Sequence, residues 1–301
     1  DVVHFQHVQG VSARLIELAG ARPRFATLHD YWYFCANSQL VRPDRSPCAG
    51  PSAGCRNCVD CATARADLAP LRALRPLVAL PLAYRNRVLR AATQRIDHFL
   101  APSAFLRSRY VEQGFDGARI QVLENGMDLE RLRAGGDVQR PGGGLRVGFL
   151  GSLAWQKGPH VLVDAFNRLP AATTASLTLY GSGSAFPDYA ATLRSAIRHP
   201  AITLAGPVAY DDVGRVLRTF DVLVVPSLWY ENSPLVIQEA YALGIPVLAS
   251  NLGALAEKVE DGRTGRLFPA GDAAALARLL LELTAHPEAL AVWRRQIRPP
   301  P

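Results

Sequence analysis

The chain lacks a long apolar run. Among its 301 residues, no stretch approaches the roughly 20 consecutive apolar residues that cross a bilayer, which excludes a helical membrane span and predicts a soluble protein. The chain also lacks an initiator Met and a basic leader, because it opens at Asp1 inside the apolar run 2–5. We therefore expect that a segment upstream of Asp1 is missing.

Cysteine is absent outside one short segment. All five Cys fall between Cys35 and Cys61, and this number is odd and too local for the disulfide framework of a secreted domain. A reducing compartment fits better, so the sequence predicts a cytoplasmic protein. Nearly half of the residues are apolar and a fifth are charged, so the chain can bury a substantial core. Its length favours two domains.

Acidic residues are scarce between Arg65 and Arg119. This segment holds ten Arg against four acidic residues, spaced among Leu, Val and Ala as in a helix, within a chain of net charge +7. Two interpretations stay open: a solvated helical face, or a surface that touches anionic lipid or a lipid-linked acceptor. The second would place the protein at the inner face of the membrane.

From Leu145 onward, β-branched runs alternate with amphipathic stretches, which is the pattern of βαβ units around a parallel sheet. We predict strands at 146–151, 175–180, 202–206, 221–226 and 246–250, and helices at 158–169, 188–199, 211–220, 235–243 and 272–284. Ser233 would cap the helix 235–243, with Pro234 in its first turn and Gly244 at its end. Such a doubly wound sheet binds ligands beyond the carboxyl ends of its strands.

The N-terminal part repeats this pattern less regularly. We predict strands at 2–6, 25–29, 99–102 and 120–123, with a Cys-rich insertion at about 35–61. The glycine-rich stretch 135–144 predicts a flexible joint. We therefore predict an α/β protein with an N-terminal Rossmann-like domain, residues 1–140, and a C-terminal Rossmann-like domain, residues 145–295.

The segment 230–240 runs from a buried strand through a tight loop into a helix. The amides of Ser233, Leu235 and Val236 would point out of the helix N-terminus, where the helix dipole favours a phosphate. Glu231 precedes this N-terminus, and Glu239 lies in the second turn of the helix. Because two carboxylates would repel a phosphate, we expect them to bind neutral groups beside it, such as sugar and ribose hydroxyls.

This stretch resembles the Glu-x7-Glu motif of glycosyltransferase family 4, a family of retaining GT-B enzymes. Further segments are similar to the family's blocks in the same order, at 151–158, 180–183, 221–227, 244–247 and 261–265. The ordered set covers nearly the whole chain and is more specific than any one member. The resemblance implies two Rossmann-like domains facing across a cleft. It also implies a hexosyltransferase-like enzyme that moves a sugar from a nucleoside diphosphate to a growing surface glycan or lipid-linked sugar, with retention of configuration.

The resemblance also implies roles for single residues. Glu239 would hold the ribose hydroxyls, Glu231 would contact the donor sugar, and Lys157 would neutralise the leaving diphosphate. His29 would be a donor-sugar contact, with Asp30 orienting its ring. The catalytic candidates are therefore Glu231, Lys157 and His29, and the other donor-binding candidates are Gly151, Ser152, Gly181, Val208, Asn232, Ser233, Pro234, Leu235, Val236 and Glu239. The family usually has Arg where Ser152 stands. We therefore expect that the phosphate is neutralised less strongly here, or that a charged residue elsewhere in the chain takes over this role.

The cysteines follow the pattern Cys35-x12-Cys48-x6-Cys55-x2-Cys58-x2-Cys61. Cys pairs two residues apart in a reducing compartment typically bind a metal, and four thiolates form a closed tetrahedral zinc site. Similar transferases carry a four-Cys insertion, and this resemblance implies Cys35, Cys48, Cys55 and Cys58 as ligands of a structural zinc, with Cys61 spare. An iron–sulfur cluster, free thiols or a disulfide stay open as alternatives. For the donor, the resemblance implies no metal, and the sequence has no Asp-x-Asp motif.

Two other functions stay open. In the first, the chain binds a nucleotide sugar without transferring it, because the strand and glycine-rich loop that open the family's N-terminal domain are absent before Asp1. The family's crossing C-terminal helix is also short or missing after Trp293. In the second, the Cys cluster and the basic segment form a zinc-dependent nucleic-acid module. The Arg-rich segment does not interleave its Arg with aromatic residues regularly, as a base-stacking surface would, so we expect no nucleic-acid partner.

Overall fold

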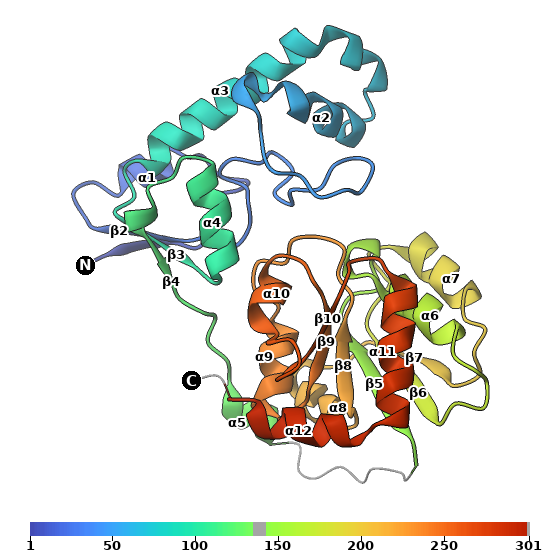
Figure 1. Cartoon of the computed structure of the whole chain (residues 1–301). Helices are drawn as coiled ribbons and strands as arrows, with labels where there is room; N and C mark the ends of the chain where they lie inside the picture. Colours follow the sequence, from blue (N-terminus) through green and yellow to red (C-terminus); the bar gives the residue numbers. More distant parts are fainter. Residues whose placement is uncertain (135–142, 300–301) are drawn as a thin grey trace. The chain divides into compact units, whose positions relative to one another are not determined.

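The computed structural model describes residues 1–134 and 143–299, in two compact units, Asp1–Asn125 and Gly126–Pro301 (Figure 1). The division lies upstream of the predicted glycine joint, most of which falls outside the described residues. Helix α5 (Leu129–Arg133) joins the second unit because Leu132 is buried in that unit's core. Within the described residues, no helix is long and apolar enough to cross a membrane.

The first unit contains a four-stranded sheet in which all neighbouring strands are parallel. Its order is β1 (Val3–Phe5), β2 (Arg24–Thr27), β3 (His98–Ala101) and β4 (Ile120–Val122). All four predicted N-terminal strands are therefore confirmed. Helix α1 (Leu15–Leu18) follows β1, and helix α4 (Ala104–Glu112) follows β3. Ser103 caps α4, since its Oγ accepts the Leu106 N–H at 3.1 Å.

An aromatic cluster holds the loop that follows β2. Tyr110 of α4 is fully buried, and its hydroxyl donates to the Asp30 carbonyl at 2.7 Å. The rings of Phe34 and Phe115 each lie 4.9 Å from the Tyr110 ring in edge-to-face contact. Such pairs contribute beyond simple burial. The loop is thus packed against α4, which fixes the backbone just after His29.

The insertion between β2 and β3 is mainly helical. It contains the 3-10 turn η1 (Ala53–Cys58), helix α2 (Val59–Arg65), the 3-10 turn η2 (Ala69–Leu74) and helix α3 (Arg75–Thr93). Helix α3 has 19 residues and includes Pro81. Ala79, Leu89 and Ala92 are buried on one of its faces. The helix-like spacing of the Arg-rich segment is confirmed. A short 3-10 turn, η3 (Gly117–Arg119), precedes β4.

The second unit contains a six-stranded parallel sheet of order β10-β9-β8-β5-β6-β7. Its strands are β5 (Leu145–Leu150), β6 (Ala175–Tyr180), β7 (Ile202–Gly206), β8 (Val222–Val225), β9 (Val247–Ser250) and β10 (Gly265–Phe268). The chain starts in the middle of the sheet, runs outward to β7, and then returns to β8 on the other side of β5. This order is doubly wound, and its switch point lies between β5 and β8.

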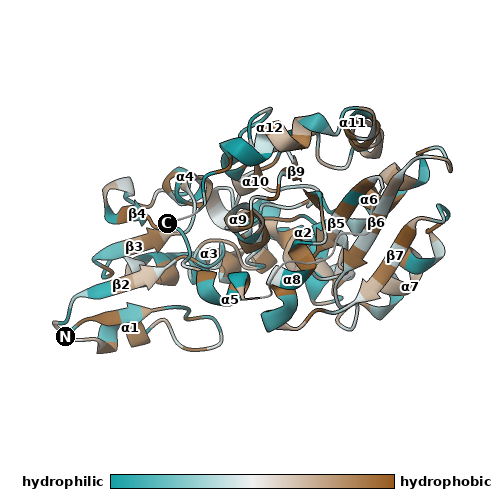
Figure 2. Cartoon of the chain, turned by 90° about the horizontal axis from the view of Figure 1, so that it is seen from below, coloured by the Kyte–Doolittle hydropathy of each residue, from teal (hydrophilic) through white to brown (hydrophobic). Residues whose placement is uncertain are grey.

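Helices cover both faces of this sheet (Figure 1). On one face, α6 (Pro159–Asn167), α7 (Pro187–Ser195), α11 (Ala273–Ala285) and α12 (Glu288–Gln296) share a core with the strands. On the other, α8 (Val213–Leu217), α9 (Leu235–Ala242) and α10 (Ala254–Lys258) join α5 in a second core. Figure 2 shows hydrophilic and hydrophobic residues alternating along α12, as expected for a helix with one buried face.

The five predicted C-terminal strands and the five predicted helices are present. The predicted helix 211–220 is divided into the turn η5 (Tyr210–Asp212) and α8. Four elements of this unit were not predicted from the sequence: β10, α5, α10 and α12. Strand β10 is a four-residue edge strand without a β-branched run, so only its parallel pairing with β9 identifies it.

Candidate active site

A cavity of about 310 Å³ opens at the carboxyl ends of β5 and β8, at the switch point of the second sheet. It is lined by these predicted donor-binding residues: Gly151, Ser152, Lys157, Glu231, Ser233, Pro234, Leu235 and Val236. Its volume falls at the lower end of the range of small-molecule sites. The fold therefore brings two loops that are about 75 residues apart in sequence to one cavity.

Lys157 and Glu231 form an ion pair inside this cavity. The Lys157 Nζ lies 2.8 Å from Glu231 Oε1 and 3.0 Å from Oε2. The Glu231 side chain is only 8% exposed, and Ser227 Oγ donates to its Oε1 at 2.8 Å. Each charge therefore neutralises the other, and a diphosphate that binds Lys157 must compete with Glu231 for the ammonium group.

Gly158 explains how Lys157 reaches this position. Lys157 ends the 3-10 turn η4 (Trp155–Lys157), and Gly158 has φ 68°. A Cβ atom at Gly158 would lie 2.0 Å from the Pro226 carbonyl oxygen. Only glycine therefore fits both the backbone conformation and the close approach of this turn to the end of β8. The Leu228 amide also donates to the Gln156 carbonyl at 2.8 Å.

The N-terminus of α9 forms one wall of the cavity, but its cap differs from the prediction. The helix begins at Leu235, and Pro234 occupies the N-cap position with ψ 92° and no capping side chain. The predicted N-cap at Ser233 is therefore wrong by one residue. Because proline has no N–H, its placement at the N-cap costs the helix no hydrogen bond. The amides of Leu235 and Val236 lie in the first turn, where α-helical amides have no intrahelical acceptor.

Ser233 keeps a place in the site without being the cap. Its hydroxyl is buried, lines the cavity and has no hydrogen-bond partner among the described residues. A buried unpaired hydroxyl is costly unless a ligand or water completes it. Its position beside the first-turn amides of α9 suits a phosphate oxygen or a sugar hydroxyl.

The remaining predicted donor residues do not line this cavity. Gly181 lies behind it, where a Cβ atom would meet the Gly151 carbonyl oxygen at 1.8 Å, so this glycine lets the two loops pack. Val208 is half-buried against the core that α8, α9 and α10 share with α5. Glu239 is half-buried on α9; burial raises the pKa of its carboxyl, and the nearby Arg131 acts in the opposite direction. Asn232 belongs to the loop between β8 and α9.

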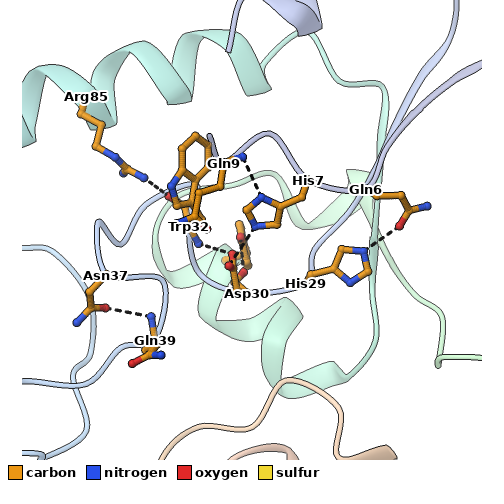
Figure 3. Close-up of polar contacts among 10 residues, drawn as sticks. Gln6, His7, Gln9, His29, Asp30, Trp32, Asn37, Gln39 and Arg85 are labelled. Carbon is orange, nitrogen blue, oxygen red and sulfur yellow. Dashed lines mark hydrogen bonds and ion pairs between the residues drawn. The ribbon is translucent and has the colours of Figure 1, made fainter. Parts of the chain in front are cut away.

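His29 lies in the first unit within a small polar cluster (Figure 3). Because β1 and β2 are adjacent and parallel, the residues after β1 lie beside the residues after β2. His29 Nε2 is 2.8 Å from Gln6 Oε1, and His7 Nε2 is 3.1 Å from Asp30 Oδ2. The hydrogen bond at the His29 Nε2 is therefore made to Gln6, while Asp30 binds His7. Gln6 and His7 were not among the predicted site residues, although Gln6 ends and His7 follows the strand predicted at 2–6.

This cluster has a defined proton arrangement at His7. The Gln9 amide donates to His7 Nδ1 at 2.9 Å, which leaves the ring proton of neutral His7 on Nε2, facing Asp30. Burial, and then the charge of His7, lower the pKa of His29, while Asp30 acts in the opposite direction. The lowered pKa favours the neutral form of His29, which suits hydrogen bonding to sugar hydroxyls.

Trp32 links this cluster to α3. Asp30 Oδ1 accepts the Trp32 amide at 2.7 Å. The Arg85 guanidinium of α3 lies 4.7 Å from the Trp32 ring centre and donates to the Trp32 carbonyl at 2.7 Å. The insertion therefore holds the loop that carries His29 (Figure 3).

The predicted zinc ligands are only partly brought together. Cys35, Cys48 and Cys58 line a second cavity of about 220 Å³, and Cys61 lines it with them. Cys55 is buried outside this lining. Within residues 1–134 and 143–299, no three Cys, His, Asp or Glu side chains are arranged to hold a metal ion. The zinc site therefore stays a prediction.

Two family models match consecutive parts of the chain. Residues 1–131 match "Glycosyltransferase Family 4", and residues 144–286 match "Glycosyl transferases group 1". A D-inositol 3-phosphate glycosyltransferase of Rhodococcus opacus is 36% identical over 192 residues, which are 59% of this chain and 43% of the relative. One of Mycobacterium marinum is 36% identical over 165 residues, which are 52% of this chain and 35% of the relative. The chain spans less than half the length of these relatives.

Solved structures share the fold. Anabaena HepE, in a complex with UDP, superposes with a TM-score of 0.70 at 20% identity, over 99% of this chain and 72% of that one. Sucrose-phosphate synthase from Thermosynechococcus elongatus superposes with a TM-score of 0.65 at 22% identity, over 94% of this chain and 63% of that one. With the two parallel-sheet units and the motif residues around the switch-point cavity, these matches establish that the chain belongs to glycosyltransferase family 4 and has the GT-B type of fold.

Proposed function

We propose that the chain binds a nucleoside diphosphate sugar at the switch-point cavity and transfers the sugar, with retention of configuration, to a hydroxyl of a glycan or lipid-linked acceptor. The observation that carries this proposal is the meeting of Lys157, Glu231 and the first turn of α9 around one cavity. Structures of HepE with UDP and with UDP-glucose, and relatives named for transfer to an inositol phosphate, support it.

The charged residues of the cavity have different roles in this proposal. The Lys157 ammonium and the amides of Leu235 and Val236 neutralise the diphosphate, on which charge accumulates as the glycosidic bond breaks. Binding of the diphosphate draws Lys157 away from Glu231, and the freed carboxylate then accepts hydrogen bonds from the donor sugar. Glu239 binds the ribose, and His29 keeps its predicted role as a contact of the donor sugar. No metal is assigned to this donor site.

The experiment that tests the donor site uses a thermal-shift panel of UDP, GDP, ADP and TDP sugars. A nucleotide sugar at 100 times its Kd stabilises by about 2.7 kcal/mol, so one base should raise the melting temperature by several degrees. The chain has only two Lys, so Lys258→Met is a matched control for Lys157→Met. We expect Lys157→Met to lower turnover by roughly 100- to 1,000-fold and Lys258→Met to leave it near the wild-type value. The proposal fails if no sugar nucleotide shifts the melting temperature.

The same panel separates transfer from binding alone. A chain that binds a nucleotide sugar without transferring it would show the thermal shift but no release of nucleoside diphosphate with any acceptor.

We further propose that α3 contacts an anionic membrane surface, which would bring a lipid-linked acceptor to the enzyme. Leu77, Leu80, Tyr84 and Val88 are 62%, 64%, 70% and 40% exposed. At 100° per residue they form one stripe, opposite the buried face that contains Ala79 and Leu89. Helix α3 carries four Arg and no acidic residue. The unit around it has sixteen Arg against ten acidic residues, so its charge complements anionic lipid.

A further inference from the structure

Ser227 is a second hydrogen-bond donor to Glu231, and it lines the same switch-point cavity as the Lys157–Glu231 ion pair. Its side chain is fully buried, and its Oγ lies 2.8 Å from Glu231 Oε1. Among the described residues, Ser227 and Lys157 together supply the hydrogen bonds that the Glu231 carboxylate accepts. Ser227 was not among the site residues predicted from the sequence.

The two carboxylate oxygens of Glu231 have different partners. Oε1 accepts from Ser227 Oγ and from Lys157 Nζ, each at 2.8 Å, whereas Oε2 accepts from Lys157 Nζ at 3.0 Å. If Lys157 turns to a diphosphate, Oε1 keeps the hydrogen bond from Ser227, and Oε2 keeps none from the described residues. Oε2 is therefore the oxygen that can exchange the ammonium group for a sugar hydroxyl.

Two backbone contacts flank Ser227 and tie it to the turn η4. The carbonyl oxygen of Pro226, directly before Ser227, lies so close to Gly158 that a Cβ atom there would be 2.0 Å from it. The amide of Leu228, directly after Ser227, donates to the Gln156 carbonyl at 2.8 Å. The backbone of Ser227 is therefore held on both sides, and its hydroxyl can stay in place while the long lysine side chain that ends η4 moves.

The cost of opening the ion pair falls on Glu231. The Lys157 side chain is 32% exposed, so its ammonium group can reach solvent or a ligand, whereas the Glu231 side chain is 8% exposed. A buried charge that loses its partner is strongly destabilising. Ser227 reduces this cost, because a hydroxyl that donates to an ionised carboxylate replaces part of the lost hydration.

We propose that Ser227 is a positioning residue for Glu231: it holds the carboxylate in the cavity while a diphosphate withdraws Lys157, and it leaves Oε2 to accept a sugar hydroxyl. A nucleotide that still carries its sugar replaces the ammonium group that Glu231 loses. A free nucleoside diphosphate offers no such replacement and leaves Glu231 with Ser227 alone. This inference rests on the proposed donor site.

The ion pair therefore distinguishes the donor from the product. It opposes the binding of a free nucleoside diphosphate more than the binding of the intact nucleotide sugar. After transfer the sugar has left the cavity, so Glu231 can bind Lys157 again, which favours release of the nucleoside diphosphate.

The test is calorimetric titration of the full chain with UDP and with UDP-glucose. Ser227→Ala should weaken UDP binding about tenfold, because Glu231 loses its remaining donor once UDP withdraws Lys157. It should weaken UDP-glucose binding less, about threefold, because a sugar hydroxyl still donates to the carboxylate. Glu231→Gln should have the opposite effect and strengthen UDP binding about tenfold, because no charge then competes for Lys157.

A double-mutant cycle decides whether Ser227 acts through Glu231. In the Glu231→Gln background, Ser227→Ala should change UDP binding by less than about twofold, because no charge remains to be held. Ser250→Ala is the matched control. Ser250 is likewise fully buried and ends the neighbouring strand β9, and it is not among the described residues that line the cavity. Both affinities should stay near the wild-type values in this control.

Three results would overturn the proposal while leaving the donor site intact: Ser227→Ala weakens UDP and UDP-glucose equally or not at all, its effect is undiminished in the Glu231→Gln background, or Glu231→Gln does not strengthen UDP binding. The first two are expected of a serine that serves packing alone. Failure of the donor site itself gives another pattern, in which the wild type binds neither UDP nor UDP-glucose, and this inference then fails with it.

Discussion

At the scale of single residues, the charged groups of the donor site are arranged at some cost to stability. Glu231 is buried but paired with Lys157, whereas Glu239 is half-buried with only the nearby Arg131 to favour its charge. A half-buried carboxylate on the helix whose first turn lines the cavity has no evident structural use. It is typical of a group retained for binding.

Glu239→Gln tests this trade-off. Because burial raises the pKa of Glu239 in the folded state, its stabilising contribution is present below the unfolded-state pKa and is lost as pH rises through the folded-state pKa. At pH 8 the variant should therefore melt at a higher temperature than the wild type, and the difference should disappear toward pH 4. Donor affinity should fall by about 10- to 100-fold, since a hydrogen bond to a charged group is lost.

The measurements are melting temperature against pH and calorimetric titration with UDP-glucose. Glu282→Gln on α11 is the control, because its side chain is 58% exposed. A variant that binds the donor as well as the wild type would show that Glu239 does not hold the ribose.

At the scale of elements, α3 has a stripe of exposed apolar residues opposite its buried face. A surface helix of a globular unit usually has only one apolar face, which packs on the core. The second face, with the Arg residues beside it, is the basis of the membrane proposal.

Vesicle co-sedimentation tests α3. We expect binding to vesicles that contain phosphatidylglycerol, weaker binding at high salt, and none to phosphatidylcholine vesicles. Leu80→Ser and Tyr84→Ser should each weaken binding about fivefold, taking ~1 kcal/mol for a partly inserted side chain. Leu281→Ser on α11, where the side chain is 39% exposed, is the matched control. Equal binding by all variants, or a change only in oligomeric state, would contradict a lipid partner.

At the scale of the whole molecule, the chain consists of two compact units that meet in sequence at Asn125 and Gly126. The proposed donor residues Lys157, Glu231 and Glu239 belong to the second unit, and His29 and the five cysteines belong to the first. We therefore expect a ligand that binds one unit to shift the unfolding transition of that unit and not that of the other.

Differential scanning calorimetry tests this separation. UDP-glucose should raise the temperature of one unfolding transition by a few degrees, and a strong chelator should lower the temperature of the other. If both additions shift a single shared transition, the units do not unfold independently and the assignment of one ligand to each unit loses its support.

Local sequence determined much of this protein. Alternating β-branched and amphipathic segments predicted the strands and helices of the second unit, and the segment 230–240 predicted an anion site at a helix N-terminus. These features depend on neighbouring residues, which the sequence places together. The one-residue error at Ser233 shows the limit, because a cap depends on the φ and ψ angles of the loop before the helix.

Only the tertiary structure decided which distant residues meet. The order of the strands places β5 beside β8, and this adjacency brings Lys157 to Glu231, 74 positions away in sequence. The pairing of β1 with β2 likewise brings Gln6 to His29, and the folding of the insertion places Cys61, but not Cys55, in the lining of the cavity that Cys35, Cys48 and Cys58 also line. Sequence spacing carries no such information, because contacts between remote segments are set by sheet order and packing.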